Sequence, residues 1–310
     1  MKVVSHLNDI KNDDGSVPII GMTIGNFDGV HKGHRYLLQT VKKSCELKKI
    51  KFAVMTFVPH PHQILSTNFR HYLLNSYEDR RKMLAEIGVD YLVEIDFNRD
   101  FSTMKPEQFL ENYLFVYPQL LQIHLGHDFA FGMNKEGTFN LVKKIGAQKK
   151  IEVIIEDEFK DGAVVSSSAI RELVREGKMP EAAGLLDRNF FLNGRVIKGE
   201  GRGKKIGFPT ANLQLDSDIL LPRKGVYITK TFVRGMVFQS ITNVGKNPTF
   251  NDEEIIHVET NLLDFDQDIY GETIKVSFLG KIRDEKKFES VNKLIEQLKL
   301  DVSSAKSFFA

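Results

Sequence analysis

The stretch VPIIGMTIGNFDGVHKGH, residues 17–34, decides how the first half of the chain folds. Its first part, VPIIGMTI, is mainly apolar, and a turn rich in Gly and Asp then leads into a helical pattern over 34–49. An apolar run that passes through a short turn into an amphipathic helix predicts a buried strand of a parallel sheet and a helix that covers it. Ligands of open α/β sheets bind at the carboxyl ends of the strands, so we expect a site in the turn at 25–34.

The same alternation of strand and helix continues through the first half. Four further apolar runs are separated by helical patterns: 51–57, 90–95, 122–126 and 151–156. The clearest helix is predicted over 76–88, because Ser76 and Asp79 have the spacing of a helix start and Gly88 that of a helix end. We therefore predict an α/β domain with a parallel sheet that carries helices on both faces.

The pattern changes near residue 190. Two short helical stretches, 166–177 and 179–187, are followed by short runs rich in β-branched and aromatic residues, with Gly, Asn and Asp between them. Such runs predict a small antiparallel barrel or sandwich, and a last helix is predicted over about 290–300. A chain of 310 residues is long enough for two cores. We place the boundary after residue 187, which gives domains at 1–187 and 188–310.

Composition narrows the classes of protein. The net charge is only +2, which argues against the basic field of a non-specific nucleic-acid binder. The single cysteine, Cys45, excludes an intrachain disulfide framework and fits a reducing compartment. No apolar run is long enough to span a bilayer, and residues 1–16 lack the apolar stretch of a secretory signal. We expect a cytoplasmic protein with no nucleic-acid or membrane partner; the oligomeric state stays open.

Two histidines mark the predicted site of the first half. His31 and His34 are three residues apart at a predicted helix start, a spacing that places both rings on one face. Such a helix start binds anions, and the rings can donate hydrogen bonds to a triphosphate as charge builds on a leaving pyrophosphate. Gly25 and Gly33 allow a ligand to approach closely. The bare spacing also fits a helix cap with two exposed histidines; zinc is less favoured, since no third ligand stands out.

The dodecamer GRGKKIGFPTAN, residues 201–212, carries the predicted site of the second half. A glycine-rich loop can hold phosphates through backbone N–H groups, although the order of residues is not that of a P-loop. Thr210 and Asn212 are two apart on an extended segment and face the same way, so their oxygens suit Mg²⁺. Taken alone, the segment also fits a strand with a Thr–Asn ladder pair. The predicted phosphate contacts in this stretch are Gly201, Gly203, Lys205 and Gly207.

The two sites belong to a series of motifs that occur in a fixed order: GNFDGVHKGH (25–34), TFVPHP (56–61), LGHDFAFG (125–132), VSSSAIRELVREG (165–177), then PTAN, GVY, NVGKNPTF and HVETN. From about residue 18 to 300 the chain resembles the bacterial bifunctional riboflavin kinase/FMN adenylyltransferases, also called FAD synthetases. The resemblance implies a nucleotidyltransferase domain that makes FAD from FMN and ATP with release of pyrophosphate. It also implies a riboflavin kinase β-barrel that makes FMN, with ATP as co-substrate and Mg²⁺ as cofactor.

The resemblance implies a role for each matching residue. His31 and His34 act on the α-phosphate and the leaving group, Glu259 is the base for riboflavin, and Thr210 and Asn212 hold Mg²⁺. The remaining implied contacts with ATP or its phosphates are Gly25, Phe27, Asp28, Gly33, Ser167, Ser168 and Arg171. The implied flavin contacts are Pro59, His60, Asp128 and Phe129.

The position of Arg171 gives a separate, physical reason to expect a phosphate contact. Ser166, Ser167 and Ser168 can cap a helix, which would place Arg171 in the first turn, where a cation opposes the helix dipole. A phosphate between this arginine and the helix start would remove the conflict. The alternative is an ordinary surface arginine.

Three positions depart from the family pattern. Asn261 stands where the family has His after Glu-Thr, and Ala130 and Thr138 replace an Arg and an Asp. We expect the first change to bear on flavin packing or orientation and the other two to weaken FMN or phosphate binding. They motivate a riboflavin kinase with a degenerate N-terminal domain as one alternative. A non-catalytic flavin-binding regulator is a second alternative, which the low net charge disfavours.

Overall fold

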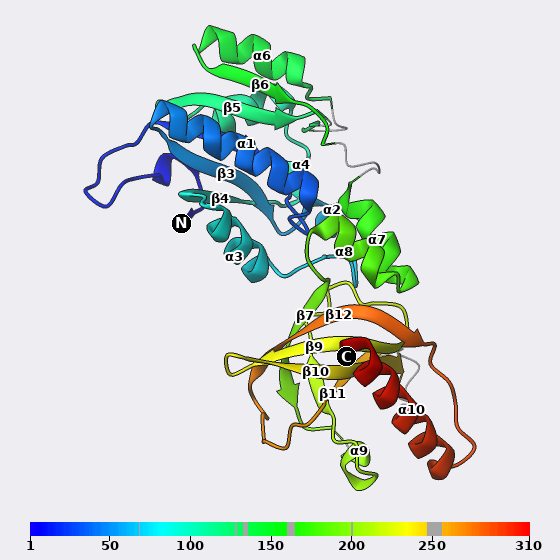
Figure 1. Ribbon diagram of the computed structural model, residues 1–310. Helices are drawn as coiled ribbons and strands as arrows, with labels where there is room; N and C mark the ends of the chain where they lie inside the picture. The colour runs from blue at the N-terminus through cyan, green and yellow to red at the C-terminus, as the bar shows by residue number, and fades with distance from the viewer. Residues whose placement is uncertain (68, 128, 133–135, 160–164, 200, 247–255) are drawn as a thin grey trace. The chain divides into compact units, whose positions relative to one another are not determined.

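The computed structural model describes residues 1–310 except 68, 128, 133–135, 160–164, 200 and 247–255 (Figure 1). The described residues pack as two compact units. Unit 1 comprises Met1–Phe69 and Ser76–Val165, and unit 2 comprises Arg70–Asn75 and Ser166–Ala310. Unit 2 therefore takes up the helices that precede the predicted boundary at 187; the boundary between two catalytic modules stays a prediction.

Unit 1 is built on a six-stranded sheet in the order β1-β4-β3-β2-β5-β6, in which every neighbouring pair is parallel. The strands are β1 (Lys2–Val4), β2 (Ile20–Ile24), β3 (Lys51–Val58), β4 (Tyr91–Asp96), β5 (Leu120–Gly126) and β6 (Glu152–Glu156). The helices are η1 (Leu7–Asp9), α1 (Lys32–Lys48), α2 (Pro61–Leu65), α3 (Tyr77–Ile87), α4 (Arg99–Ser102), α5 (Pro106–Phe109), η2 (Leu110–Leu114) and α6 (Phe139–Gln148). The predicted parallel α/β sheet is confirmed.

Alternate residues of the strands feed two hydrophobic cores. On β3, Ala53 and Met55 join the core with η2 and α6, whereas Phe52 and Val54 join the core with α1 and α3. This alternation gives the sheet helices on both faces, as predicted. Cys45 of α1 is 1% exposed in the second core, and burial raises the pKa of its thiol to about 11.

Local signals set the ends of the helices in unit 1. The hydroxyl of Ser76 accepts a hydrogen bond from the backbone N–H of Asp79 at 3.0 Å, and Gly88 ends α3 in the left-handed conformation, both as predicted. Helix α1 begins at Lys32, two residues before its expected start, because His31 acts as its cap.

Unit 2 is a closed antiparallel barrel in the order β10-β11-β8-β7-β12-β9, preceded by two helices and ended by a third. Its strands are β7 (Phe191–Ile197), β8 (Ala211–Gln214), β9 (Gly225–Val233), β10 (Met236–Lys246), β11 (Ile256–Leu262) and β12 (Thr273–Arg283). Its helices are α7 (Ser167–Glu176), α8 (Met179–Leu186), α9 (Arg202–Lys205) and α10 (Val291–Phe309). The structure thus selects the barrel over the sandwich.

Helix α10 runs to Phe309, well past its predicted end near residue 300 (Figure 1). The added turns contain Asp301, which is 1% exposed and accepts hydrogen bonds from the Arg283 guanidinium of β12 at 2.8–3.2 Å. Ala305 packs in the same core cluster as β9 and β10 residues. Tertiary packing therefore extends the helix through a serine-containing stretch of modest helix propensity.

Five hydroxyl groups lie inside the barrel and bond to one another. Thr242 Oγ1 is 2.8 Å from Thr229 Oγ1 and 3.0 Å from Thr260 Oγ1, and Ser240 Oγ lies 2.8 Å from both Thr229 and Thr231. All five side chains have no exposed surface. Buried hydroxyls are stable only when bonded, so this network favours the pairing of β9, β10 and β11 in one register.

We predict that Thr242→Val destabilises the barrel by about 1–2 kcal/mol, because two buried hydroxyls each lose a partner while the side-chain shape is kept. Hydrogen exchange of peptides from β9 to β11 should become faster. The control is Thr273→Val on the exposed part of β12, which should leave the exchange unchanged. Equal effects of the two substitutions would contradict a stabilising network.

Candidate active sites

The candidate site of unit 1 lies where the order of strands reverses. Strands β3 and β4 follow β2 on one side, whereas β5 and β6 lie on its other side, so a switch point falls between β2 and β5. Loops that leave the carboxyl ends of β2, β3 and β5 carry the predicted residues of this half. Because parallel strands end at one edge of the sheet, the three loops share that edge.

The loop after β2 is tightly wound. Phe27 and Val30 have backbone φ angles of 49° and 38°, positive values that residues other than Gly rarely adopt. Phe27 and Asp28 are 1% and 3% exposed, and a Cβ on Gly25 would lie only 3.1 Å from the Phe27 ring. Gly25 and Phe27 therefore shape the loop; their predicted contacts with ATP stay predictions.

His31 and His34 come together at the end of this loop. His31 is the cap of α1, and its Nδ1 accepts a hydrogen bond from the backbone N–H of His34 at 3.3 Å. The two rings stack with centroids 3.6 Å apart and planes 16° apart, on one face as their spacing predicted. The alternative of a helix cap is thus partly right, although His31 is buried at 5% exposure.

The bond at Nδ1 also fixes which ring nitrogen of His31 can act. A nitrogen that accepts an N–H bond carries no proton, so the proton of the neutral ring is on Nε2. The ring is then oriented to donate through Nε2 rather than Nδ1. Gly33 sits beside it, since a Cβ there would lie 3.4 Å from the His31 ring.

The loop after β3 carries two of the predicted flavin contacts. Pro59 follows Val58 through a cis peptide bond, and His60 caps the short helix α2 by accepting a hydrogen bond from the N–H of His62 at 3.1 Å. His60 is buried at 6% exposure and its ring centroid lies 6.2 Å from that of Phe69. His60, a predicted flavin contact, therefore also stabilises the start of α2.

The loop after β5 holds Phe129, a predicted flavin contact, stacked on Phe131 with centroids 5.2 Å apart. Phe131 in turn exchanges backbone hydrogen bonds with Gly137 at 2.9 and 3.2 Å. The predicted flavin contact Asp128 lies outside the described residues. The departures at Ala130 and Thr138 fall on exposed positions, so neither disturbs the core.

Arg171 of unit 2 does not lie where the sequence placed it. Ser166 caps α7 by accepting from the N–H of Ala169 at 3.2 Å, so Arg171 is the fifth helical residue and lies past the first turn. It is 4% exposed, so it is not a surface arginine either. Its Nε donates to the Tyr72 carbonyl at 2.9 Å, and its guanidinium lies 3.8 Å from the Tyr72 ring centroid. The argument from an unfavourable dipole was therefore wrong, because the cap is the first of the three serines and Arg171 lies beyond the first turn.

The local backbone explains why glycine occupies three positions of the dodecamer. Gly201 and Gly207 have φ angles of 68° and 84°, at either end of the short helix α9. A Cβ on Gly203 would lie 2.3 Å from the Phe208 carbonyl oxygen, so the loop closes only around glycine. Lys205 is exposed at the end of this helix. A wound loop of this kind presents N–H groups in several directions, as phosphate binding needs.

A row of polar residues crosses three barrel strands. Asn212 of β8 is directly opposite Glu259 of β11, and Glu259 is opposite Asn243 of β10. All three are partly exposed, whereas their strand neighbours Val258 and Thr260 are buried. The register therefore brings together the predicted base and one predicted Mg²⁺ ligand, which are far apart in the sequence. Asn243 was missed because only strand pairing places it there.

Asn261, the third departure, holds the Pro-Thr-Ala-Asn segment to β11. Its side-chain N–H donates to the Pro209 carbonyl oxygen at 2.6 Å. It lies on the same face as Glu259, two residues away. The amide therefore fixes the backbone next to Thr210.

Comparison with known proteins names the family. The model of the FAD synthetase family matches residues 16–169, and the model of the riboflavin kinase family matches residues 186–309. A bifunctional riboflavin kinase/FMN adenylyltransferase from Listeria monocytogenes is 35% identical over 291 residues, which cover 93% of this chain and 92% of the relative. The chain belongs to the bifunctional riboflavin kinase/FMN adenylyltransferase family.

Further relatives match along nearly the whole chain. An Escherichia coli protein with the same name is 34% identical over 290 residues, covering 93% of this chain and 92% of the relative. A crystal structure described as a macrolide-efflux protein from Streptococcus pneumoniae superposes with a TM-score of 0.87 at 32% identity, covering 98% of each chain. That description applies to the relative. Within the described residues of this chain, no helix is long and apolar enough to cross a bilayer.

The two candidate sites of this bifunctional family member fall in different matched parts. The histidine loop lies within the FAD synthetase match and the Asn212–Glu259 pair within the riboflavin kinase match. Ser167 and Ser168 end the first match but pack with unit 2. Their contact with a polyphosphate, like that of Arg171, stays a prediction.

Gly199 is a further residue of the candidate site in the barrel that the sequence analysis missed. A Cβ there would lie 2.2 Å from Nδ2 and 2.7 Å from Cγ of Asn212. The bare glycine therefore leaves the space in which the Asn212 amide lies. The signal was present in the run KGEGRG, where glycines recur at every second residue, but only those from Gly201 on were considered.

We predict that Gly199→Ala displaces the Asn212 amide and lowers riboflavin kinase turnover by at least about tenfold, with little change in FAD formation from supplied FMN. The control is Gly280→Ala on β12, where a Cβ meets no atom within 4 Å. Both activities are measured by chromatography of the flavins. Equal kinase rates in the two variants would show that the position of the Asn212 amide does not matter.

Proposed function

We propose that the stacked histidines of unit 1 and the Asn212–Glu259 pair of unit 2 are the centres of two successive reactions of flavin synthesis. The barrel phosphorylates riboflavin with ATP to give FMN, and unit 1 adenylylates FMN with a second ATP to give FAD. The observation that carries the proposal is the presence in one chain of two separate polar centres, each within one matched family domain.

In the kinase step, Glu259 accepts the proton of the terminal ribityl hydroxyl of riboflavin. The hydroxyl oxygen forms a bond to the γ-phosphorus of ATP, the bond from that phosphorus to the β–γ bridging oxygen breaks, and ADP leaves. The carboxylate is partly exposed on the outer face of β11, where a substrate can reach it. The glycine loop with Gly201, Gly203 and Gly207 holds the phosphates of ATP, and Lys205 adds positive charge.

Two oxygen-bearing side chains at the end of the glycine loop suit Mg²⁺ as ligands. Thr210 and Asn212 offer a hydroxyl and an amide oxygen, hard ligands of the kind that Mg²⁺ takes together with substrate phosphates. Gly199 and Asn261 hold this segment in place, which fits a site built for a small ion. When bound there, Mg²⁺ would neutralise the negative charge that develops on the phosphates of ATP.

In the adenylyl step, a phosphate oxygen of FMN forms a bond to the α-phosphorus of ATP. The bond from that phosphorus to the α–β bridging oxygen breaks, and pyrophosphate leaves. His31 and His34 donate hydrogen bonds to the α-phosphate and to the leaving pyrophosphate, beside the N–H groups at the start of α1. Pro59, His60 and Phe129 contact the flavin from the neighbouring loops.

We also propose a cytoplasmic location for both reactions. The single cysteine, Cys45, is buried and has no partner for an intrachain disulfide, which fits a reducing compartment, and riboflavin, FMN and ATP are small soluble partners. A kinase with a degenerate N-terminal domain, or a flavin-binding regulator, would each give a different outcome in the assays that follow.

We predict that the two reactions separate by mutation. Wild-type protein given riboflavin, ATP and Mg²⁺ should make FMN and then FAD. Glu259→Gln should lower kinase turnover on the order of 10²–10⁴-fold yet still convert supplied FMN to FAD, because it removes only the base. His31→Ala/His34→Ala should stop at FMN, with adenylylation down on the order of 10²–10³-fold.

In this experiment each variant keeps one activity, which serves as the control for its folding. A wild-type protein that stops at FMN would establish the kinase-only alternative. A protein that binds flavin but forms neither product would favour the regulator.

We predict that Thr210→Ala raises the Mg²⁺ concentration needed for half-maximal kinase activity by about tenfold, because one oxygen donor is lost. Thr210→Ser keeps the hydroxyl and should restore the wild-type value. Kinase rates are measured over a series of free Mg²⁺ concentrations set with EDTA, with adenylylation of FMN as the control reaction. An unchanged Mg²⁺ dependence in Thr210→Ala would exclude Thr210 as a ligand.

A further inference from the structure

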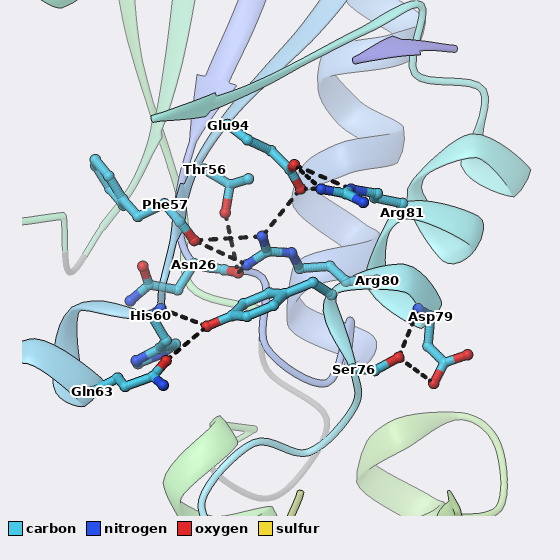
Figure 2. A network of polar contacts seen from close by, with 11 residues as sticks. Asn26, Thr56, Phe57, His60, Gln63, Ser76, Asp79, Arg80, Arg81 and Glu94 are labelled. Atoms are coloured by element: carbon cyan, nitrogen blue, oxygen red, sulfur yellow. Dashed lines mark hydrogen bonds and ion pairs between the residues drawn. The ribbon is translucent and has the colours of Figure 1, made fainter. Parts of the chain in front are cut away.

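Helix α3 places a buried arginine under the loops of the unit 1 site (Figure 2). Arg80 is 2% exposed and heads the largest fully buried side chains among the described residues. It follows Ser76, the cap of α3, by four residues, so its position on the helix face is fixed by the first turn. A buried guanidinium is costly unless its donors are paired, and in Arg80 the two Nη groups, but not Nε, have hydrogen-bond partners among the described residues.

Two of these partners are backbone carbonyls, one in the site loop after β2 and one at the end of β3, where the next site loop begins. Nη1 of Arg80 donates to the Asn26 oxygen at 2.9 Å, in the loop that leads to His31. Nη1 and Nη2 lie 3.5 and 3.4 Å from the Phe57 oxygen, just before the loop that carries Pro59. One rigid, planar group thus joins both loops.

The sheet itself no longer joins these loops at this point. The N–H of Gly25 donates to the Met55 carbonyl at 3.1 Å, and this bond continues the β2–β3 ladder past the last residue of β2. Beyond this bond, the segment after β2 leads to α1 and the segment after β3 leads to α2. The Asn26 carbonyl then receives Arg80, with Thr56 Oγ1 as a second donor at 3.4 Å. Arg80 therefore joins the two segments of backbone at the point where the hydrogen bonds between β2 and β3 stop.

The positive charge is balanced from the sheet side. Nη2 of Arg80 lies 3.5 Å from Oε1 of Glu94 on β4, a side chain that is 9% exposed. Arg81 binds the same carboxylate through Nε at 3.0 and 3.1 Å, but its own side chain is 43% exposed. Burial lowers the pKa of the Arg80 guanidinium, and the negative charges of Glu94 and Asp28 oppose that shift.

Tyr77 adds a second fixed point from the same helix face. Its hydroxyl accepts a hydrogen bond from the backbone N–H of His60 at 2.6 Å and donates to Gln63 Oε1 at 3.2 Å (Figure 2). The Arg80 guanidinium lies 5.0 Å from the centroid of the Tyr77 ring. The two side chains, three residues apart, therefore hold the loop after β3 on both sides of Pro59.

We propose that Arg80 is a positioning residue for adenylyl transfer, which fixes the loop of His31 and His34 relative to the loop of Pro59 and His60. This inference rests on the proposed function, in which the first loop holds the reacting phosphates and the second contacts the flavin. Arg80 touches neither substrate. Its effect is on the distance between the FMN phosphate and the α-phosphate of ATP, on which the rate of an in-line attack depends steeply.

The test compares Arg80→Ala with Arg81→Ala. Arg80→Ala should lower kcat for FAD formation about 100-fold with a smaller change in KM for ATP, because substrates still bind but are held apart. Riboflavin kinase activity of the same protein should stay within about twofold of wild type. Arg81→Ala removes a cation from the same Glu94 without touching either loop, so its FAD formation should stay near wild type.

Chemical rescue separates positioning from a general loss of structure. Millimolar guanidinium ion, well below denaturing concentrations, should restore at least about tenfold of the lost kcat in Arg80→Ala, since it supplies the missing donors. It should have no effect on wild type or on Arg81→Ala. Lack of rescue together with equal losses in both arginine variants would overturn the proposal.

A third variant covers the case in which Arg80→Ala does not fold. Arg80→Lys keeps the charge but replaces the planar fork with one compact donor, so it should fold, melt like wild type and form FAD at an intermediate rate. Turnover equal to wild type in Arg80→Lys would overturn the proposal. Failure of the proposed function is a different result, because wild-type protein itself would then make no FAD.

Discussion

Backbone carbonyl groups at the end of a strand still need a donor where water is partly excluded, and in unit 1 the guanidinium of Arg80, with Thr56 Oγ1, meets this requirement. Strands β2 and β3 separate after Gly25 and Met55, and the carbonyls of Asn26 and Phe57 turn to the guanidinium of Arg80. The loops can then keep the irregular backbone that a ligand site needs without losing their spacing. The spacing of the loops after β2 and β3 therefore depends on a side chain, Arg80, where the hydrogen bonds between the two strands stop.

Unit 2 meets the same requirement in two further places. Asn261 donates to the Pro209 carbonyl next to the proposed metal ligands, and Arg171 donates to the carbonyl of Tyr72. In each case the donor comes from a regular helix or strand and the acceptor lies in an irregular segment. Helices and strands are stiff. A loop that is bonded to a side chain of such an element therefore has a better defined position than a loop without such a bond.

These long-range donors are also what the sequence could not predict. The parallel sheet, the start of α3 at Ser76 and its end at Gly88 follow from local patterns and were predicted correctly. Arg80 and Arg81, in contrast, are adjacent in a charged run, and only tertiary packing decides that the first is buried and the second exposed. The pairing of Asn212 with Glu259 depends in the same way on the register of β8 with β11, which no local signal contains.

The structure also gives a physical reading of the departure at Asn261. The family has an imidazole at this position, and both an imidazole and an amide can donate one N–H bond to a carbonyl. In this chain the amide does so, at 2.6 Å from the Pro209 oxygen. In this chain the amide thus ties the Pro-Thr-Ala-Asn segment to β11, a bond that an imidazole could also make. The departure at Asn261 is therefore compatible with the paired arrangement of Asn212 and Glu259 on the same two strands.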